Sequence, residues 1–112
     1  MNTGKTWIGR FFKGFVYAFE GVVSCIKTER NMRFHIGVAV LVILLMRFYG
    51  LSTAETAAVY ICIGLVISLE LVNTAVEAAV DMACKDKNPL AKKAKDCAAG
   101  AVLVAAIVSV AV

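Results

Sequence analysis

Four polar side chains recur at helical spacing in the second half of the sequence: Glu70, Asn73, Glu77 and Asp81. At ~100° per residue, their positions fall within about 80° of each other, so they share one narrow face of a helix. We call this set the acidic row. Its carboxylates point in one direction and repel each other unless cations lie against them. The acidic row therefore predicts a site that holds positive charge.

Two kinds of positive charge would stabilise the acidic row. Lysine and arginine side chains of neighbouring helices would make it a purely structural network of ion pairs. A divalent metal would make it a reaction site, because Mg²⁺ takes oxygen ligands and is usually held by one or two carboxylates plus substrate phosphates. Glu29 lies at a depth similar to that of Glu77 and would supply the second carboxylate. Glu70 lies deeper and is less hydrated, which suits a general base acting on a buried hydroxyl.

Basic residues near the acidic row suit the binding of phosphate. Lys92 and Lys95 flank Asp96, and Arg10 lies near the N-terminus. Phosphate-bearing ligands need such positive charge. A second interpretation is topological, since positive residues gather on the cytoplasmic side of membrane proteins whatever their function. We interpret His35 as a polar residue satisfied near the membrane interface rather than as a ligand.

The composition indicates a small integral membrane protein. The 112 residues are 61% hydrophobic and 18% charged, with a mean hydropathy of +0.81. Soluble chains are about 45–50% apolar and about 25% charged. So much apolar material excludes intrinsic disorder, and the length excludes a large soluble enzyme. The four cysteines form no CxxC pair, which argues against a zinc site or a disulfide framework.

The apolar segments predict an all-α fold in a single domain, residues 1–112. Helices that contain membrane spans are expected over about residues 31–49, 53–84 and 94–112. A span needs about 17–25 residues. Eleven of the twelve lysines and arginines fall in residues 1–33 or in residues 85–96. The positive-inside rule places both in the cytoplasm and the C-terminus outside.

Residues 1–30 have a different pattern. Between positions 7 and 26, aromatic and aliphatic residues recur at spacings of three and four, with Arg10, Lys13, Tyr17 and Glu20 among them. Such a helix is suited to lying on the membrane surface. The alternative is a fourth, imperfect span, which its interior charges make costly.

The run at 70–81, ELVNTAVEAAVD, resembles the signature ExxNTAxExxxD of the prokaryotic diacylglycerol kinase family, which includes the undecaprenol kinases of Gram-positive bacteria. Arg10, FVYAFEG at 15–21, TERN at 28–31 and AKDCAAG at 94–100 extend the resemblance over nearly the whole chain. It implies a surface helix and three transmembrane helices, assembled as a homotrimer with shared active sites at the cytoplasmic face of the bacterial cell membrane. The implied reaction transfers the γ-phosphate of MgATP to a membrane lipid hydroxyl.

The resemblance also implies a role for each matching residue. Glu70 would be the general base, and Glu29 and Glu77 would bind Mg²⁺. The ATP site would comprise these two metal ligands and seven further residues: Arg10, Tyr17, Glu29, Glu77, Asp86, Lys87, Asn88, Lys95 and Asp96. Asn73 and Asp81 would support the site. Arg10, Glu70 and Ala99 would contact the lipid.

The preferred lipid and the class of protein have alternatives. Diacylglycerol-type members often have serine where this chain has Ala18, and they extend beyond the third span, so undecaprenol is favoured over diacylglycerol.

A small multidrug transporter would need four spans and an isolated glutamate in the first. A non-catalytic scaffold would assemble through the small residues of the third span. Neither rival explains Glu29, Glu77 and Asp96 together. No nucleic-acid partner is expected.

Overall fold

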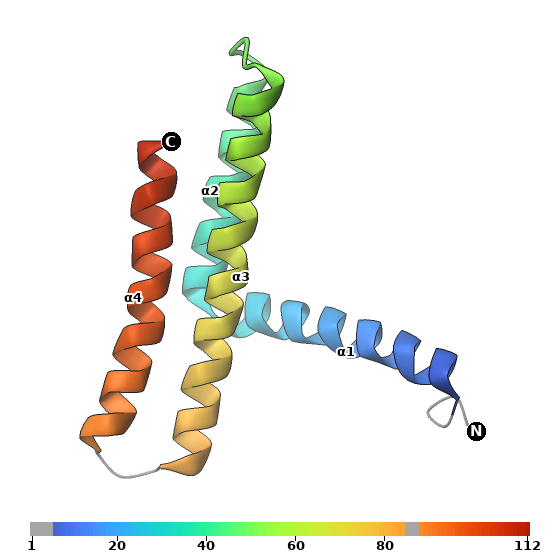
Figure 1. The fold of residues 1–112 in the computed structure, drawn as a ribbon, viewed down its shortest axis with the longest axis vertical. Helices are drawn as coiled ribbons and strands as arrows, with labels where there is room; N and C mark the ends of the chain where they lie inside the picture. Colours follow the sequence, from blue (N-terminus) through green and yellow to red (C-terminus); the bar gives the residue numbers. More distant parts are fainter. Residues whose placement is uncertain (1–5, 85–87) are drawn as a thin grey trace.

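The computed structural model describes residues 6–84 and 88–112, which form four α-helices (Figure 1). These are α1 (Trp7–Thr28), α2 (Arg30–Met46), α3 (Thr53–Ala83) and α4 (Pro89–Ala111). α3 packs against both α2 and α4, whereas α1 projects sideways from this bundle. The prediction of an all-helical chain is confirmed.

α1 begins with a polar cap and carries an exposed aromatic surface. The Thr6 hydroxyl accepts a hydrogen bond from the Gly9 N–H at 2.9 Å, which satisfies a free donor of the first turn. The rings of Trp7 and Phe11 stack at 5.7 Å, and Phe15 meets Phe11 edge-on at 5.0 Å. All three side chains are more than half exposed. Aromatic side chains with this exposure favour the interface between membrane and water.

The junction between α1 and α2 turns sharply at Glu29. The extended backbone of Glu29 (φ −108°, ψ 115°) separates the two helices, and its N–H donates to the Cys25 carbonyl at 2.8 Å. Arg33 closes the turn, because its guanidinium donates to the carbonyls of Ile26 and Lys27, both at 2.9 Å. These carbonyls belong to the last turn of α1, where intrahelical donors run out. The junction therefore fixes the backbone position of Glu29.

Two of the described helices are long and apolar enough to cross a membrane. α3 has 31 residues and α4 has 23, with mean hydropathies of 2.0 and 1.8 over their most apolar windows. α2 has 17 residues, which gives a length of about 25 Å against a hydrocarbon core of roughly 30 Å. The expected helix over 31–49 ends instead at Met46, because a turn precedes Gly50. A third span in α2 remains a prediction.

Capping residues set the other helix boundaries. Ser52 and Glu55 form a reciprocal capping box at the start of α3, with hydrogen bonds of 2.8 and 3.1 Å. α4 begins at Pro89 rather than near residue 94, because Asn88 caps its first turn and proline fits the first helical position. Both long helices therefore start at a polar signal rather than at the onset of the apolar run.

Much apolar surface of the bundle has no partner within the described chain. Leu41 of α2, Ile61 of α3 and Leu103 of α4 are 56%, 69% and 61% exposed. Apolar patches of this extent face lipid or another protein surface. The fold is thus that of a membrane helix bundle.

Candidate functional site

Glu70 is the most deeply buried carboxylate of the acidic row. It lies about 25 Å along α3 from Thr53, and only 2% of its surface is exposed. Its Oε2 lies 3.4 Å from Nε2 of His35 on α2. A buried carboxylate is costly unless polar or charged groups compensate it. His35 thus takes part in the site, which the sequence interpretation missed, since no spacing signal relates position 35 to position 70.

Asn73 and Glu77 continue the row by one turn each. The Asn73 amide Nδ2 donates to Glu77 Oε1 at 3.0 Å, and Asn73 is 6% exposed. The other amide atom, Oδ1, is buried without a hydrogen-bond partner in the part of the chain that the structure describes. Asn73 therefore holds the Glu77 carboxylate and leaves one oxygen acceptor unused beside it.

A chain of hydrogen bonds connects Glu29 to the row. The Thr74 hydroxyl donates to the Glu70 carbonyl at 3.0 Å, and the Cys25 thiol lies 3.4 Å from the same hydroxyl. Because the Glu29 N–H binds the Cys25 carbonyl, the start of α2 is anchored beside Thr74. Thr74 lies between Asn73 and Glu77 along α3. The fold thus brings the backbone of Glu29 to the same end of the bundle as the acidic row.

The C-terminal end of the acidic row, at Asp81, has a lysine partner. Lys95 Nζ on α4 lies 2.6 Å from Asp81 Oδ1, and this pair joins α3 to α4. About one turn before Lys95 on α4, Lys92 forms an ion pair with Asp96 of the same helix at 2.6 Å. This hydrogen bond, together with the attraction of the Asp96 charge, raises the pKa of Lys92 above its ordinary value. Ion pairing therefore accounts for Asp81, whereas among the described residues no lysine or arginine lies within ion-pair distance of Glu70 or Glu77.

Several predicted site residues lie apart from the row in the single chain. Arg10 is exposed on the projecting part of α1, about 22 Å along the helix from Cys25, and Tyr17 is exposed on the same helix. Asn88 uses its side chain to cap α4, accepting from the Leu90 N–H at 2.8 Å. Ala99 is exposed on α4. Asp86 and Lys87 lie outside the described residues, so their predicted roles stay predictions.

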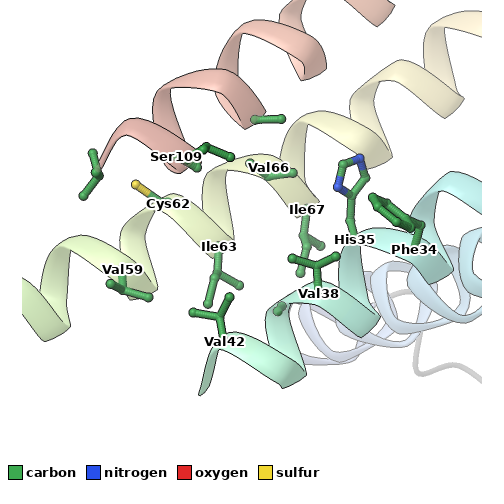
Figure 2. A pocket seen from close by; sticks show the side chains of 14 residues that line it. Phe34, His35, Val38, Val42, Val59, Cys62, Ile63, Val66, Ile67 and Ser109 are labelled. Atoms are coloured by element: carbon green, nitrogen blue, oxygen red, sulfur yellow. The ribbon is translucent and has the colours of Figure 1, made fainter. Parts of the chain in front are cut away.

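An apolar groove adjoins the buried carboxylate. It has a volume of about 520 Å³ and is lined by α2, α3 and the end of α4. Figure 2 shows His35 and Phe34 at the end of the groove opposite Val59. Valine and isoleucine side chains such as Val38 and Ile67 form most of its wall. The imidazole therefore stands between an apolar groove and the Glu70 carboxylate.

The oxygen atoms of the site fit a magnesium ion that is completed by phosphate. No group of three histidine, cysteine, aspartate or glutamate side chains suited to a metal is found within residues 6–84 and 88–112. Mg²⁺ does not require one, because substrate phosphates and waters complete its six ligands. Glu77, the unused Asn73 oxygen beside it and Glu29 at the neighbouring junction are hard oxygen donors of the kind that Mg²⁺ takes.

Fold and site together define an all-helical membrane protein in which a histidine lies between a buried carboxylate and an apolar groove. Residues 16–112 match the family described as prokaryotic diacylglycerol kinase. The chain belongs to this family and is a lipid kinase. The family uses ATP as its phosphoryl donor, and the family resemblance noted in the sequence is confirmed. The transporter and scaffold alternatives do not apply.

Curated relatives carry two different names. The chain is 45% identical over 102 residues to undecaprenol kinase of Bacillus subtilis, an alignment that covers 91% of this chain and 83% of that protein. It is 44% identical over 97 residues to a diacylglycerol kinase of Synechocystis, covering 86% of this chain but only 55% of that relative. A diacylglycerol kinase of Haemophilus influenzae is 33% identical over 89 residues, covering 80% and 75%. The match to the Bacillus protein supports the undecaprenol-kinase-like branch.

Proposed function

We propose that this chain transfers the γ-phosphate of MgATP to the hydroxyl of undecaprenol, with Glu70 as the general base. The observation that carries the proposal is the burial of Glu70, a carboxylate 2% exposed on a helix apolar enough to span a membrane. An apolar groove ends at His35, the neighbour of this carboxylate, and such a groove suits an alcohol attached to a hydrocarbon chain. A water-soluble acceptor would not need a base at such a place.

In the proposed reaction, Glu70 accepts the proton of the lipid hydroxyl while the hydroxyl oxygen forms a bond to the γ-phosphorus. The bond between that phosphorus and the β,γ-bridging oxygen breaks, and ADP leaves with the electron pair. Phosphoryl transfer depends chiefly on in-line positioning and on stabilising charge on the phosphates. A base held on a rigid helix helps to position the lipid hydroxyl in line with the γ-phosphate.

The nucleotide side of the site would use the more hydrated residues. Glu29 and Glu77 would hold Mg²⁺, and Asn73 would orient Glu77 through its 3.0 Å hydrogen bond. Bound Mg²⁺ would supply neutralisation of charge on the β- and γ-phosphates. The remaining proposed ATP contacts are those expected from the sequence: Arg10, Tyr17, Asp86, Lys87, Asn88, Lys95 and Asp96. Asp81 would support the site by pairing with Lys95, and Ala99 would contact the lipid.

A homotrimer with shared sites would unite residues that one chain holds apart. α1 carries Arg10 and Tyr17 away from its own bundle (Figure 1), where they would reach the site of a neighbouring copy. The exposed apolar faces of α2 to α4 would be covered partly by other copies and partly by lipid. With α2 as a third span, the N-terminus and the site lie in the cytoplasm and the C-terminus lies outside.

Diacylglycerol is the second candidate acceptor, since the Synechocystis relative at 44% identity bears that name. The test is phosphate transfer from γ-labelled ATP in mixed micelles with Mg²⁺, with undecaprenol and diacylglycerol offered separately to the wild-type protein. Faster labelling of undecaprenol supports the proposal. Faster labelling of diacylglycerol overturns the choice of lipid, and labelling of neither by folded protein overturns the proposed reaction.

A further inference from the structure

We infer that His35 is a positioning residue, which holds the Glu70 carboxylate in the orientation that lets it accept a proton from the lipid hydroxyl. The inference rests on the proposed role of Glu70 as the base. Its starting point is the 3.4 Å approach of His35 Nε2 to Glu70 Oε2, between side chains that are 19% and 3% exposed. The two residues come from different helices, so their contact also fixes α2 against α3.

Other polar groups near Glu70 are engaged elsewhere. The Asn73 amide donates to Glu77, and the Thr74 hydroxyl donates to the backbone carbonyl of Glu70 rather than to its carboxylate. The nearest basic side chain along α2, Arg33, is bound to carbonyls of α1. Within the described residues, His35 is thus the side chain found within ion-pair distance of the Glu70 carboxylate.

The His35 imidazole packs edge-on against the Phe34 ring, with the ring centroids 5.7 Å apart, but this contact does not use its nitrogen atoms. The groove it borders is lined mostly by apolar side chains such as Val38 and Ile67, against which a ring nitrogen gains nothing. Its polar edge instead meets the one buried carboxylate of the described chain. A buried polar group left without a polar neighbour is strongly unfavourable, so the contact offsets part of the cost of burying the carboxylate.

The contact with His35 also distinguishes the two carboxylate oxygens. His35 lies 3.4 Å from Oε2 of Glu70, so Oε1 is the oxygen that we expect to accept the proton. Without His35, the flexible glutamate side chain would sample other rotamers inside the bundle. A misplacement on the order of 1 Å is enough to cost about 10²-fold in rate.

Two substitutions of similar size separate positioning from packing. His35→Gln keeps a nitrogen donor near the place of Nε2, whereas His35→Leu keeps the bulk and removes the donor. Positioning predicts that His35→Leu lowers kcat about 10²-fold with the KM for ATP unchanged, and that His35→Gln restores most of the loss. A packing role predicts the reverse order, because leucine suits an apolar groove and glutamine does not. His35→Met serves as the second apolar replacement if the leucine variant fails to fold.

The measurement is kcat with the better lipid acceptor for each variant, with oligomer size and helix content checked in detergent. Leu41→Ala, an exposed truncation on the same helix outside the groove, is the matched control and retains wild-type kcat. The inference is overturned if the folded leucine or methionine variant is as active as the wild type. It is also overturned if the glutamine variant is no more active than the leucine and methionine variants. These results leave the proposed phosphate transfer intact, because that reaction is overturned only if the wild-type protein labels neither lipid.

Discussion

Removing the Asn73 amide should weaken the binding of Mg²⁺ to the site by a measurable amount. Asn73 is 6% exposed and donates to Glu77 at 3.0 Å, so little solvent screens the interaction. A hydrogen bond to a charged group contributes about 1.5–3 kcal/mol. Since about 1.4 kcal/mol is a factor of ten, Asn73→Ala should raise the Mg²⁺ concentration for half-maximal activity roughly 10- to 100-fold. Supporting residues around metal ligands show effects of the same size.

The assay is a Mg²⁺ titration of phosphate transfer at saturating ATP and lipid. Ser109→Ala is the control, because it also removes one side-chain hydrogen bond, of 2.7 Å to the Ala105 carbonyl within α4. It should leave the Mg²⁺ dependence unchanged. The reasoning is refuted if Asn73→Ala keeps the wild-type titration curve, or if its activity stays equally low at every Mg²⁺ concentration.

Two further predictions concern the ends of the long helices. Ser52→Ala removes the capping box of α3 and should lower the free energy of unfolding by about 1 kcal/mol, which is measured as a lower unfolding temperature in detergent. Ser52 lies at the other end of α3 from the acidic row, so the KM for ATP should not change. A changed KM would contradict the prediction. Lys95→Met should raise the KM for ATP about tenfold by removing one charged contact to phosphate, whereas Asp81→Asn, which frees Lys95 from its 2.6 Å partner, should change KM much less. Equal effects of the two substitutions would mean that Lys95 acts through the ion pair alone.

The acidic row was predictable because helical periodicity acts within one element. Glu70, Asn73 and Glu77 follow one another along α3, so their common face depends only on the 3.6-residue repeat. The hydrogen bond from Asn73 to Glu77 at i, i+4 follows from the same repeat. The aromatic spacing of α1 similarly predicted a helix with an exposed apolar surface.

Contacts between helices could not be predicted from the periodicity of the sequence. The approach of His35 to Glu70 depends on the rotation of α2 against α3, and the contact of Cys25 with Thr74 depends on the turn at Glu29. Neither rotation nor turn angle has a signal in residue spacing. The end of α2 at Met46 was also missed, because apolar residues continue beyond the helix into the turn before Gly50.

The central claim is that Glu70 takes the proton from the lipid hydroxyl. The most direct test measures transfer of labelled phosphate from ATP to undecaprenol by the wild type and by Glu70→Gln, with ATP binding measured in parallel. General base catalysis typically contributes about 10²–10⁴-fold, so transfer should fall by that factor in Glu70→Gln while ATP still binds with Mg²⁺. A Glu70→Gln protein that transfers phosphate at the wild-type rate would contradict the account.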